Sequence, residues 1–227
     1  MHVDVDLSVL YFGTPVVLVS TTNPEGTTNL APISSAWWLD DRCLIGVGDL
    51  ARTSENLRRT GECVLNLPSS AQVDAVDRIA MTTGSDPVPD AKHRQGYRYV
   101  ADKFAAAGLT RQPSDLVTPD RAEQCPIQLE CRLVDRYSLG ESRASAYQLE
   151  VVRTHVDESL VLPGTTHVDP VGWDPLIMKF CEFFGDGRPL RPSRLAAGWR
   201  MPHGAVGLND ATDRPATDRI DTAGHSR

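Results

Sequence analysis

The sequence predicts a mainly β protein with a few intervening helices, built around a β-barrel-like core. Short runs rich in β-branched residues recur between turn residues, which is typical of strands. Two longer alternating runs near residues 127–156 indicate an extended hairpin. The strands do not alternate regularly with helices, so the pattern differs from that of a doubly wound fold.

Composition sets the class of protein. The chain has 227 residues, of which 41% are hydrophobic and 23% charged, so it can bury a sizeable core. Its formal net charge of −7 argues against a dedicated nucleic-acid binder, which usually presents a basic face. No apolar run reaches the roughly 18 residues of a membrane helix, and residues 1–10 lack the basic start of a secretory signal. We therefore expect a cytoplasmic protein with no nucleic-acid or membrane partner.

The cysteines indicate reduced thiols. Their odd number and the absence of C-x-x-C spacing argue against disulfides and against a zinc site, so no metal is expected. Cys43, Cys63 and Cys131 lie within apolar strand-like runs, where a buried inert thiol is usual. A catalytic cysteine partnered by a histidine stays open as an alternative.

The first half of the chain predicts four strands and a helix. Residues 15–21 form the first strand, and turn residues at 23–26 lead to a returning strand over 27–38. The helix is predicted over 51–59, with Thr53 or Ser54 as its N-cap and a stop at Gly61. The two other strands cover residues 43–47 and 62–67.

The second half predicts helices first and then a long hairpin. A helix with one apolar face begins at Ser69, and a second spans 100–107 and ends at Gly108. Loops are expected over 83–97 and, after the second helix has ended at Gly108, up to Gln124. The hairpin strands, and a short further strand, are predicted over 127–133, 145–156 and 160–162.

The chain is predicted to contain one domain followed by a C-terminal extension. Proline and glycine punctuate the sequence from residue 186, and large apolar residues become rare beyond residue 208. We expect a domain over residues 1–185 and a C-terminal extension over 186–227 that is flexible or ordered by a partner.

The start of the predicted helix over 51–59 is a candidate anion site. Residues 46–51, Gly-Val-Gly-Asp-Leu-Ala, match the G-x-G-x-x-A dinucleotide pattern, but no acidic residue follows the next strand to hold a ribose. A helix N-terminus with Arg52, Thr53 and Ser54 combines free N–H groups, hydroxyls and a cation, which together suit an anion. The alternative is an ordinary capped helix with an exposed arginine.

Residues 29–37, Asn-Leu-Ala-Pro-Ile-Ser-Ser-Ala-Trp, form the second candidate site. Asn29, Ser34 and Ser35 need polar partners if they are buried, and Pro32 interrupts a hydrogen-bonded ladder. Backbone groups in such a segment can face a planar heteroaromatic ligand. The alternative is an edge strand with solvated serines.

These segments, in their order and spacing, resemble the flavin reductase-like family of FMN-binding split β-barrels. That family includes flavoredoxins and the reductase components of two-component monooxygenases. The resemblance covers residues 15–162. It rests on the segments 15–21 (Pro-Val-Val-Leu-Val-Ser-Thr), 29–37, 51–57 (Ala-Arg-Thr-Ser-Glu-Asn-Leu), 62–68 (Glu-Cys-Val-Leu-Asn-Leu-Pro), 102–104 with 108–109, 127–132 and 151–157.

The resemblance implies bound FMN, with FAD the less favoured option, and a set of cofactor residues. Family members commonly carry Lys or Arg, or Lys-Asp, ahead of the phosphate-binding Thr. This chain has Asp49, Ala51 and Arg52 there, so Arg52 must serve as the single cation. The implied cofactor residues are Asn29, Leu30, Ala31, Pro32, Ser34, Ser35, Ala36, Trp37, Gly48, Ala51, Arg52, Thr53 and Asn56.

The resemblance implies a homodimeric NAD(P)H-dependent flavin reductase, which can supply reduced flavin to a monooxygenase. Because the flavin carries the chemistry, no catalytic side chain is expected. His155 is expected to be structural, while Lys103 and Phe104 either approach the flavin or pack their helix. An electron-carrier flavoprotein and a non-catalytic flavin-binding protein are the alternatives.

Overall fold

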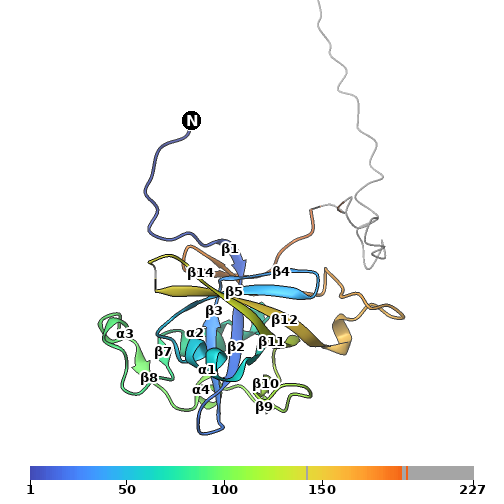
Figure 1. Ribbon diagram of the computed structural model, residues 1–227. Coiled ribbons are helices and arrows are strands. Elements are labelled where there is room, and N and C mark those ends of the chain that lie inside the picture. Colours follow the sequence, from blue (N-terminus) through green and yellow to red (C-terminus); the bar gives the residue numbers. More distant parts are fainter. Residues whose placement is uncertain (142, 191–192, 194–227) are drawn as a thin grey trace, which may run out of the picture.

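The main body of the protein is a seven-stranded antiparallel sheet. The computed structural model describes residues 1–141, 143–190 and 193, and the sheet has the strand order β3-β2-β6-β11-β12-β5-β4 (Figure 1). The predicted mainly β fold with intervening helices is confirmed. The strands are β2 (Val17–Thr22), β3 (Thr28–Ile33), β4 (Ala36–Leu39), β5 (Arg42–Gly48), β6 (Glu62–Leu67), β11 (Ile127–Ser138) and β12 (Ala144–Val156).

Helices and three small sheets complete the described part of the chain. β1 (Phe12–Pro15), β13 (Ile177–Lys179) and β14 (Glu182–Phe184) form one small sheet. The other two pair β7 (Thr82–Thr83) with β8 (Arg98–Tyr99), and β9 (Arg111–Gln112) with β10 (Arg121–Ala122). The helices are α1 (Arg52–Thr60), α2 (Val73–Ala80), α3 (Asp90–Arg94) and α4 (Lys103–Ala107), with 3-10 turns η1 (Ser70–Gln72) and η2 (Glu158–Leu160).

Both predicted hairpins are present. β2 and β3 pair in register from Val17↔Ile33 to Thr22↔Thr28, and Gly26, at φ +87°, completes the turn between them. β11 and β12 pair from Ile127↔Val156 to Ser138↔Ser145, so this hairpin is longer than predicted. Every residue of β2 is buried, which is why its sequence is an unbroken run rather than an alternating one.

Two apolar clusters form the core. One lies inside the sheet around Leu57, Leu65 and Tyr147, which are completely buried. The other joins β2 and β3 to α2 and α4, with Ile79 and Phe104 at its centre. Burial of a large apolar side chain stabilises the fold by roughly 1.5–3 kcal/mol, so these clusters hold the helices against the sheet edge.

The predicted burial of the strand cysteines is confirmed. Cys43, Cys63 and Cys131 are fully buried in the first cluster, and a hydrogen bond with Cys131 together with burial raises the pKa of Cys43. Burial also raises the pKa of Cys125 to about 12. The thiols of Cys43 and Cys125 are therefore protonated and unreactive at neutral pH, and Cys181 alone among the cysteines is exposed.

The prediction of a single strand over residues 27–38 was wrong, because this segment forms two strands, β3 and β4. The chain leaves β2 after Ile33 and joins β5 at Ala36, so β3 and β4 lie at opposite ends of the sheet order. The Gly46 N–H donates to the Ser35 carbonyl at 2.8 Å. A Cβ on Gly46 would lie 3.0 Å from the Ser35 Cβ, so glycine permits this close approach.

Other boundaries also differ from the predictions. The loop predicted over residues 83–97 contains α3, and the helix predicted over 100–107 begins only at Lys103. Residues 160–162 form an isolated bridge, Val161↔Val168, rather than a strand. The predicted extension over residues 186–227 lies mostly outside the described residues. Among the residues that are described, no helix is long and apolar enough to cross a membrane.

Candidate functional site

A cleft of about 320 Å³ opens where the break between β3 and β4 meets the N-terminus of α1. Residues 31–35 form one wall, and Gly46, Val47 and Gly48 of β5 form another. The segment from Thr82 to Tyr97 and the start of α4 close the remaining side. Three regions that are distant in the sequence therefore meet at one site.

Helix α1 begins at this cleft without a side-chain cap. Its N-cap residue is Ala51, which has no side-chain oxygen, so the expectation of a Thr53 or Ser54 cap was wrong. The Thr53 hydroxyl instead accepts a hydrogen bond from Asn29 Nδ2 at 3.3 Å, and the Ser54 hydroxyl bonds to Tyr147. The first-turn N–H groups consequently lack a side-chain acceptor, which leaves them available to an anion.

Arg52 is held at this helix mouth by two neighbours. Its Nε donates to the Gly84 carbonyl at 3.0 Å, and its Nη1 donates to Glu55 Oε2 at 2.8 Å. A guanidinium has five N–H donors, so three remain for a ligand. A Cβ on Gly84 would lie 2.5 Å from Asn29 Oδ1 and 3.3 Å from Arg52 Cγ, so only glycine lets this loop pass so close.

The cleft is positively charged within an acidic protein. Arg52, Lys92 and Lys103 line it, and no Asp or Glu is among the described lining residues. Burial, with a smaller contribution from the charge of Lys92, lowers the pKa of Lys103 to about 7. The Lys92 Nζ lies 5.5 Å from the centre of the Tyr97 ring. An anionic ligand suits this environment.

The structure brings most of the predicted cofactor residues together. Asn29, Leu30, Ala36 and Asn56 are buried outside the cleft lining, and Trp37 is 53% exposed. Asn56 Nδ2 donates to Thr21 Oγ1 at 3.1 Å and to Asn23 Oδ1 at 3.0 Å. Asn56 thus links α1 to β2 and to the turn that follows it. The predicted residues that line the cleft are Ala31, Pro32, Ser34, Ser35, Gly48, Ala51, Arg52 and Thr53.

Several lining residues were not predicted from the sequence. Three of them lie inside the two recognised motifs without having been singled out, four lie in the segment 83–97 that was interpreted as a loop, and no periodic pattern marks any of them. They are Tyr11, Ile33, Gly46, Val47, Ala80, Thr82, Thr83, Gly84, Lys92 and Tyr97. Lys103 lines the cleft, which is one of the two roles left open for it, whereas Phe104 is buried in the core between α4 and α2.

An apolar groove of about 420 Å³ adjoins the cleft. It shares Tyr11, Pro32 and Tyr97 with the cleft, and it continues over Met178 and Phe183. Together the two hollows offer charged and apolar surfaces side by side, as a ligand with a flat ring and an anionic tail requires.

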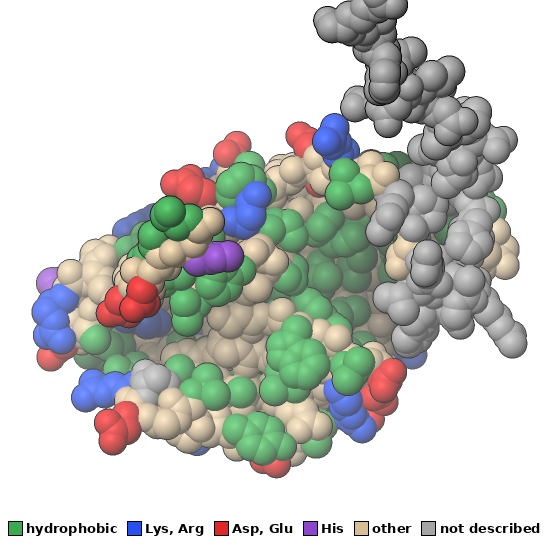
Figure 2. All heavy atoms as spheres, turned by 90° about the horizontal axis from the view of Figure 1, so that it is seen from above, with side chains coloured by type: hydrophobic (Ala, Val, Ile, Leu, Met, Phe, Trp, Pro, Cys, Tyr) green, Lys and Arg blue, Asp and Glu red, His purple; other side chains and the backbone are tan. Residues whose placement is uncertain are grey.

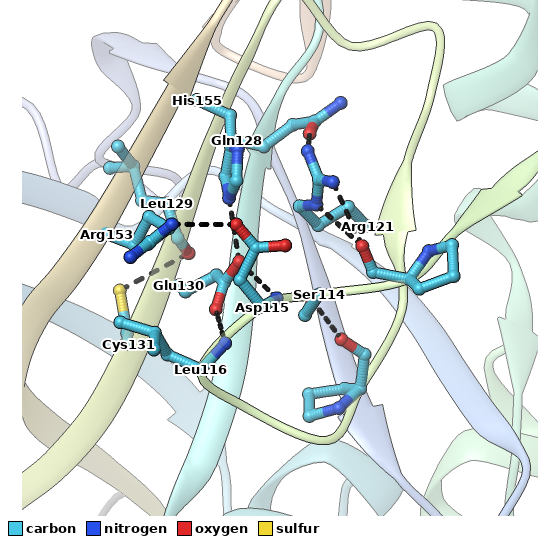
Figure 3. A network of polar contacts seen from close by, with 12 residues as sticks. Ser114, Asp115, Leu116, Arg121, Gln128, Leu129, Glu130, Cys131, Arg153 and His155 are labelled. Carbon is cyan, nitrogen blue, oxygen red and sulfur yellow. Dashed lines mark hydrogen bonds and ion pairs between the residues drawn. The ribbon is translucent and has the colours of Figure 1, made fainter.

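The group formed by Asp115, Glu130 and His155 has ligand atoms within 4.8 Å of one another, yet hydrogen bonds already account for it (Figure 3). Glu130 is fully buried and accepts the N–H groups of Asp115 at 2.9 Å and Leu116 at 2.6 Å. His155 Nε2 lies 2.7 Å from Glu130 Oε1, and Arg153 pairs with Asp115 at 2.8 Å.

The network in Figure 3 sets the pKa of the Glu130 carboxyl. Burial alone would raise that pKa, but the two backbone donors and His155 outweigh burial and hold it below its usual range. Glu130, which lies on β11, thereby links residues 115–116 to His155 on β12. This contact gives His155 a structural role of the kind expected from the sequence.

The uncapped helix mouth, the fixed arginine and the lack of a carboxylate among the described lining residues are features of a site suited to an anion. Residues 9–178 match the Flavin reductase like domain, and the chain belongs to this family. A relative from Bacillus subtilis (strain 168), called "Uncharacterized protein YdfE", is 37% identical over 183 residues, which cover 80% of this chain and 88% of that protein.

Solved structures share the fold. Flavoredoxin of Desulfovibrio vulgaris (Miyazaki F) is 21% identical with a TM-score of 0.72, and the match covers 87% of this chain and 100% of that chain. Nitrilotriacetate monooxygenase component B from Bacillus cereus is 22% identical with a TM-score of 0.64, covering 82% of this chain and 89% of that chain. The predicted split β-barrel fold class is thereby confirmed.

Proposed function

We propose that this protein binds FMN and catalyses NAD(P)H-dependent reduction of flavin, and that its reduced flavin can serve a monooxygenase. The observation that carries the proposal is the uncapped N-terminus of α1 beside Arg52, in a cleft whose described lining contains no carboxylate. Family membership supports a flavin as the ligand.

The residues of the cleft fit FMN. A phosphate monoester carries about 1.5 to 2 negative charges near pH 7, and it can take the three unused N–H groups of Arg52 with the first-turn N–H groups of α1. Strand β3 is an edge strand, so alternate backbone groups of residues 31–33 lack a sheet partner and can bind a heteroaromatic ring. One helix mouth suits the single phosphate of FMN better than the pyrophosphate of FAD.

The chain's own residues would bind and orient rather than react. Bound flavin supplies the hydride chemistry, accepting a hydride from a nicotinamide. Arg52 and the N-terminus of α1 would hold the phosphate, and residues 31–35 would hold the ring. The adjoining apolar groove would leave room for a second ligand. No side chain needs to move a proton in this scheme.

A homodimer completes the proposal. Phe12, Trp37, Leu39 and Phe180 are large apolar side chains that are exposed in the single chain. Figure 2 shows hydrophobic side chains gathered in the hollow of the face seen from above, with charged side chains along its rim. A second copy would cover such a surface. Five free thiols suit the reducing cytoplasm, where we place the protein.

Titration with FMN, followed by anaerobic addition of NADH or NADPH, tests this function. FMN binding and rapid bleaching by one of the nicotinamides is the expected result. Tightly bound FMN that neither nicotinamide bleaches would instead support an electron carrier, as the likeness to flavoredoxin allows. A protein that FMN neither binds nor stabilises against heating would refute both.

A further inference from the structure

A second cavity, of about 410 Å³, opens in a part of the protein that does not contribute to the cleft. It is lined by residues of β9 and β10, the start of β11 and the end of β12, and none of its described lining residues belongs to the cleft or to the apolar groove. Most of these lining residues are polar or charged. A volume of this size can hold a small molecule, and this lining suits a polar one.

A buried arginine without a counter-charge lines this cavity. Arg121 is 8% exposed, and it forms no ion pair with any residue that the structure describes. Its Nε and Nη2 donate to the Pro113 carbonyl at 3.1 and 2.9 Å, and its Nη1 donates to Gln128 Oε1 at 2.7 Å, where Figure 3 shows the guanidinium facing Gln128. Both acceptors are neutral, and two of the five guanidinium N–H donors remain unused. Since a buried charge without a counter-charge is costly, a bound anion would stabilise this arginine.

Uncharged hydrogen-bonding groups lie beside Arg121. The half-buried side chain of Gln112 forms no hydrogen bond with another residue in the described ranges. His155 uses its Nε2 for the Glu130 carboxylate at 2.7 Å. Because a carboxylate accepts hydrogen bonds, Nε2 carries the proton, and Nδ1 of the neutral ring is left as an acceptor. The cavity therefore offers an acceptor for a ligand N–H group as well as donors for an anion.

Two exposed carboxylates also line the cavity, on Glu123 and Asp157. Asp157 Oδ1 accepts from the Ser159 N–H at 2.9 Å and from the Ser159 hydroxyl at 2.7 Å, so it is already engaged. Glu123 has no side-chain partner within the described part of the chain. A purely anionic ligand would meet repulsion from these carboxylates, and a purely cationic ligand would meet repulsion from Arg121. A small molecule that carries both charges avoids both penalties.

We propose that this cavity binds a small zwitterion of the amino-acid class, with its carboxylate on Arg121 and its ammonium group towards Glu123. Gln112 and Nδ1 of His155 would bind the remaining polar groups of the ligand. The site does not depend on the proposed flavin function, because it shares no described lining residue with the cleft.

Calorimetric titration of the full-length protein with glycine, L-glutamine, acetate and methylammonium tests this site. Acetate carries only the negative group of an amino acid, and methylammonium carries only the positive one. Arg121→Gln removes the buried charge, and Glu123→Gln removes an exposed one. Glu158→Gln is the matched control, because Glu158 is exposed and does not line the cavity. Thermal melting checks that each variant is folded, and the titrations are repeated at saturating FMN.

At least one of the two amino acids should bind more tightly than acetate and methylammonium. Arg121→Gln should weaken that amino acid by roughly ten- to a hundredfold, as expected for a lost charge-assisted contact in a buried site. Glu123→Gln should weaken it by roughly two- to fivefold, because an exposed ion pair contributes less. Glu158→Gln and saturating FMN should leave its affinity unchanged.

Three results would overturn the proposal: neither amino acid binds, acetate binds as tightly as the amino acids, or the Glu123→Gln and Glu158→Gln proteins bind the amino acids equally well. The last comparison still decides the matter if Arg121→Gln does not fold. Competition between an amino acid and FMN would also contradict a site separate from the cleft.

Discussion

The buried ammonium of Lys103 makes a quantitative prediction about stability. Burial, aided by the charge of Lys92, lowers its pKa from 10.5 to about 7. One pKa unit corresponds to about 1.4 kcal/mol, so keeping this lysine charged in the ligand-free fold costs at most roughly 5 kcal/mol. Lys103→Met removes that cost and retains a side chain of similar length.

The sign of the pH dependence follows from proton binding. Between pH 7 and 10.5 the unfolded chain keeps the proton on Lys103 while the folded protein has released it. The free energy of unfolding of the wild type must therefore rise with pH across this window. The same reasoning gives a gain of up to about 3 kcal/mol between pH 6 and pH 9.

Urea denaturation of the ligand-free wild type and of Lys103→Met at pH 6, 7, 8 and 9 measures the effect. The variant should be more stable than the wild type at pH 6, and its advantage should shrink steadily towards pH 9. Other titrating groups cancel in this difference, because the two proteins share them. A difference that does not vary with pH, or a variant less stable at pH 6, would refute the reasoning.

Four further predictions follow from named contacts. Arg52→Ala should weaken FMN by about 1.5–3 kcal/mol but leave riboflavin, which has no phosphate, nearly unchanged; equal losses in fluorescence titrations would remove Arg52 from the phosphate site. Gly84→Ala should shift Arg52 and weaken FMN more than riboflavin, because its Cβ would lie 2.5 Å from Asn29 Oδ1. Glu130→Gln should destabilise the fold by about 1–3 kcal/mol at pH 7; because the pKa of Glu130 is lowered, this deficit should fade as the pH falls below about 4.5 in urea titrations. Cys181→Gly should raise the melting temperature, since Cys181 has φ +68° in a two-residue turn and a non-glycine residue there costs about 1–2 kcal/mol; an unchanged or lower value would contradict the strain.

The local parts of the fold could be predicted because they depend on neighbouring residues. The β-branched run at 17–22 and the turn ending at Gly26 are enough to indicate the first hairpin, and alternation over 127–156 indicates the second. The break between β3 and β4 could not be predicted in this way. It depends on a contact between Ser35 and Gly46, and no local pattern signals that contact.

The residues of the site likewise divide into those that local sequence patterns predict and those that they do not. The prediction included Arg52 and four of the five residues from 31 to 35, because a motif or a run of unexpected polar residues marks them. Gly84 and Lys92 were not included, because their role comes from contacts with residues more than 30 positions away or from a cleft that the fold assembles. The absence of a side-chain cap on α1 could not be predicted either, because Thr53 and Ser54 are typical capping residues. In the structure they form hydrogen bonds with Asn29 and Tyr147 instead.

Arg52 and Lys103, which both line the cleft, would respond differently to an anion bound there. Arg52 remains charged at any physiological pH and is already oriented, so a phosphate that binds there brings no proton with it. Lys103, with its pKa near 7, is only partly charged at neutral pH, so an anion that binds beside it must also favour protonation of the lysine. A fixed charge suits a cofactor that stays bound, and an adjustable one suits a ligand that comes and goes.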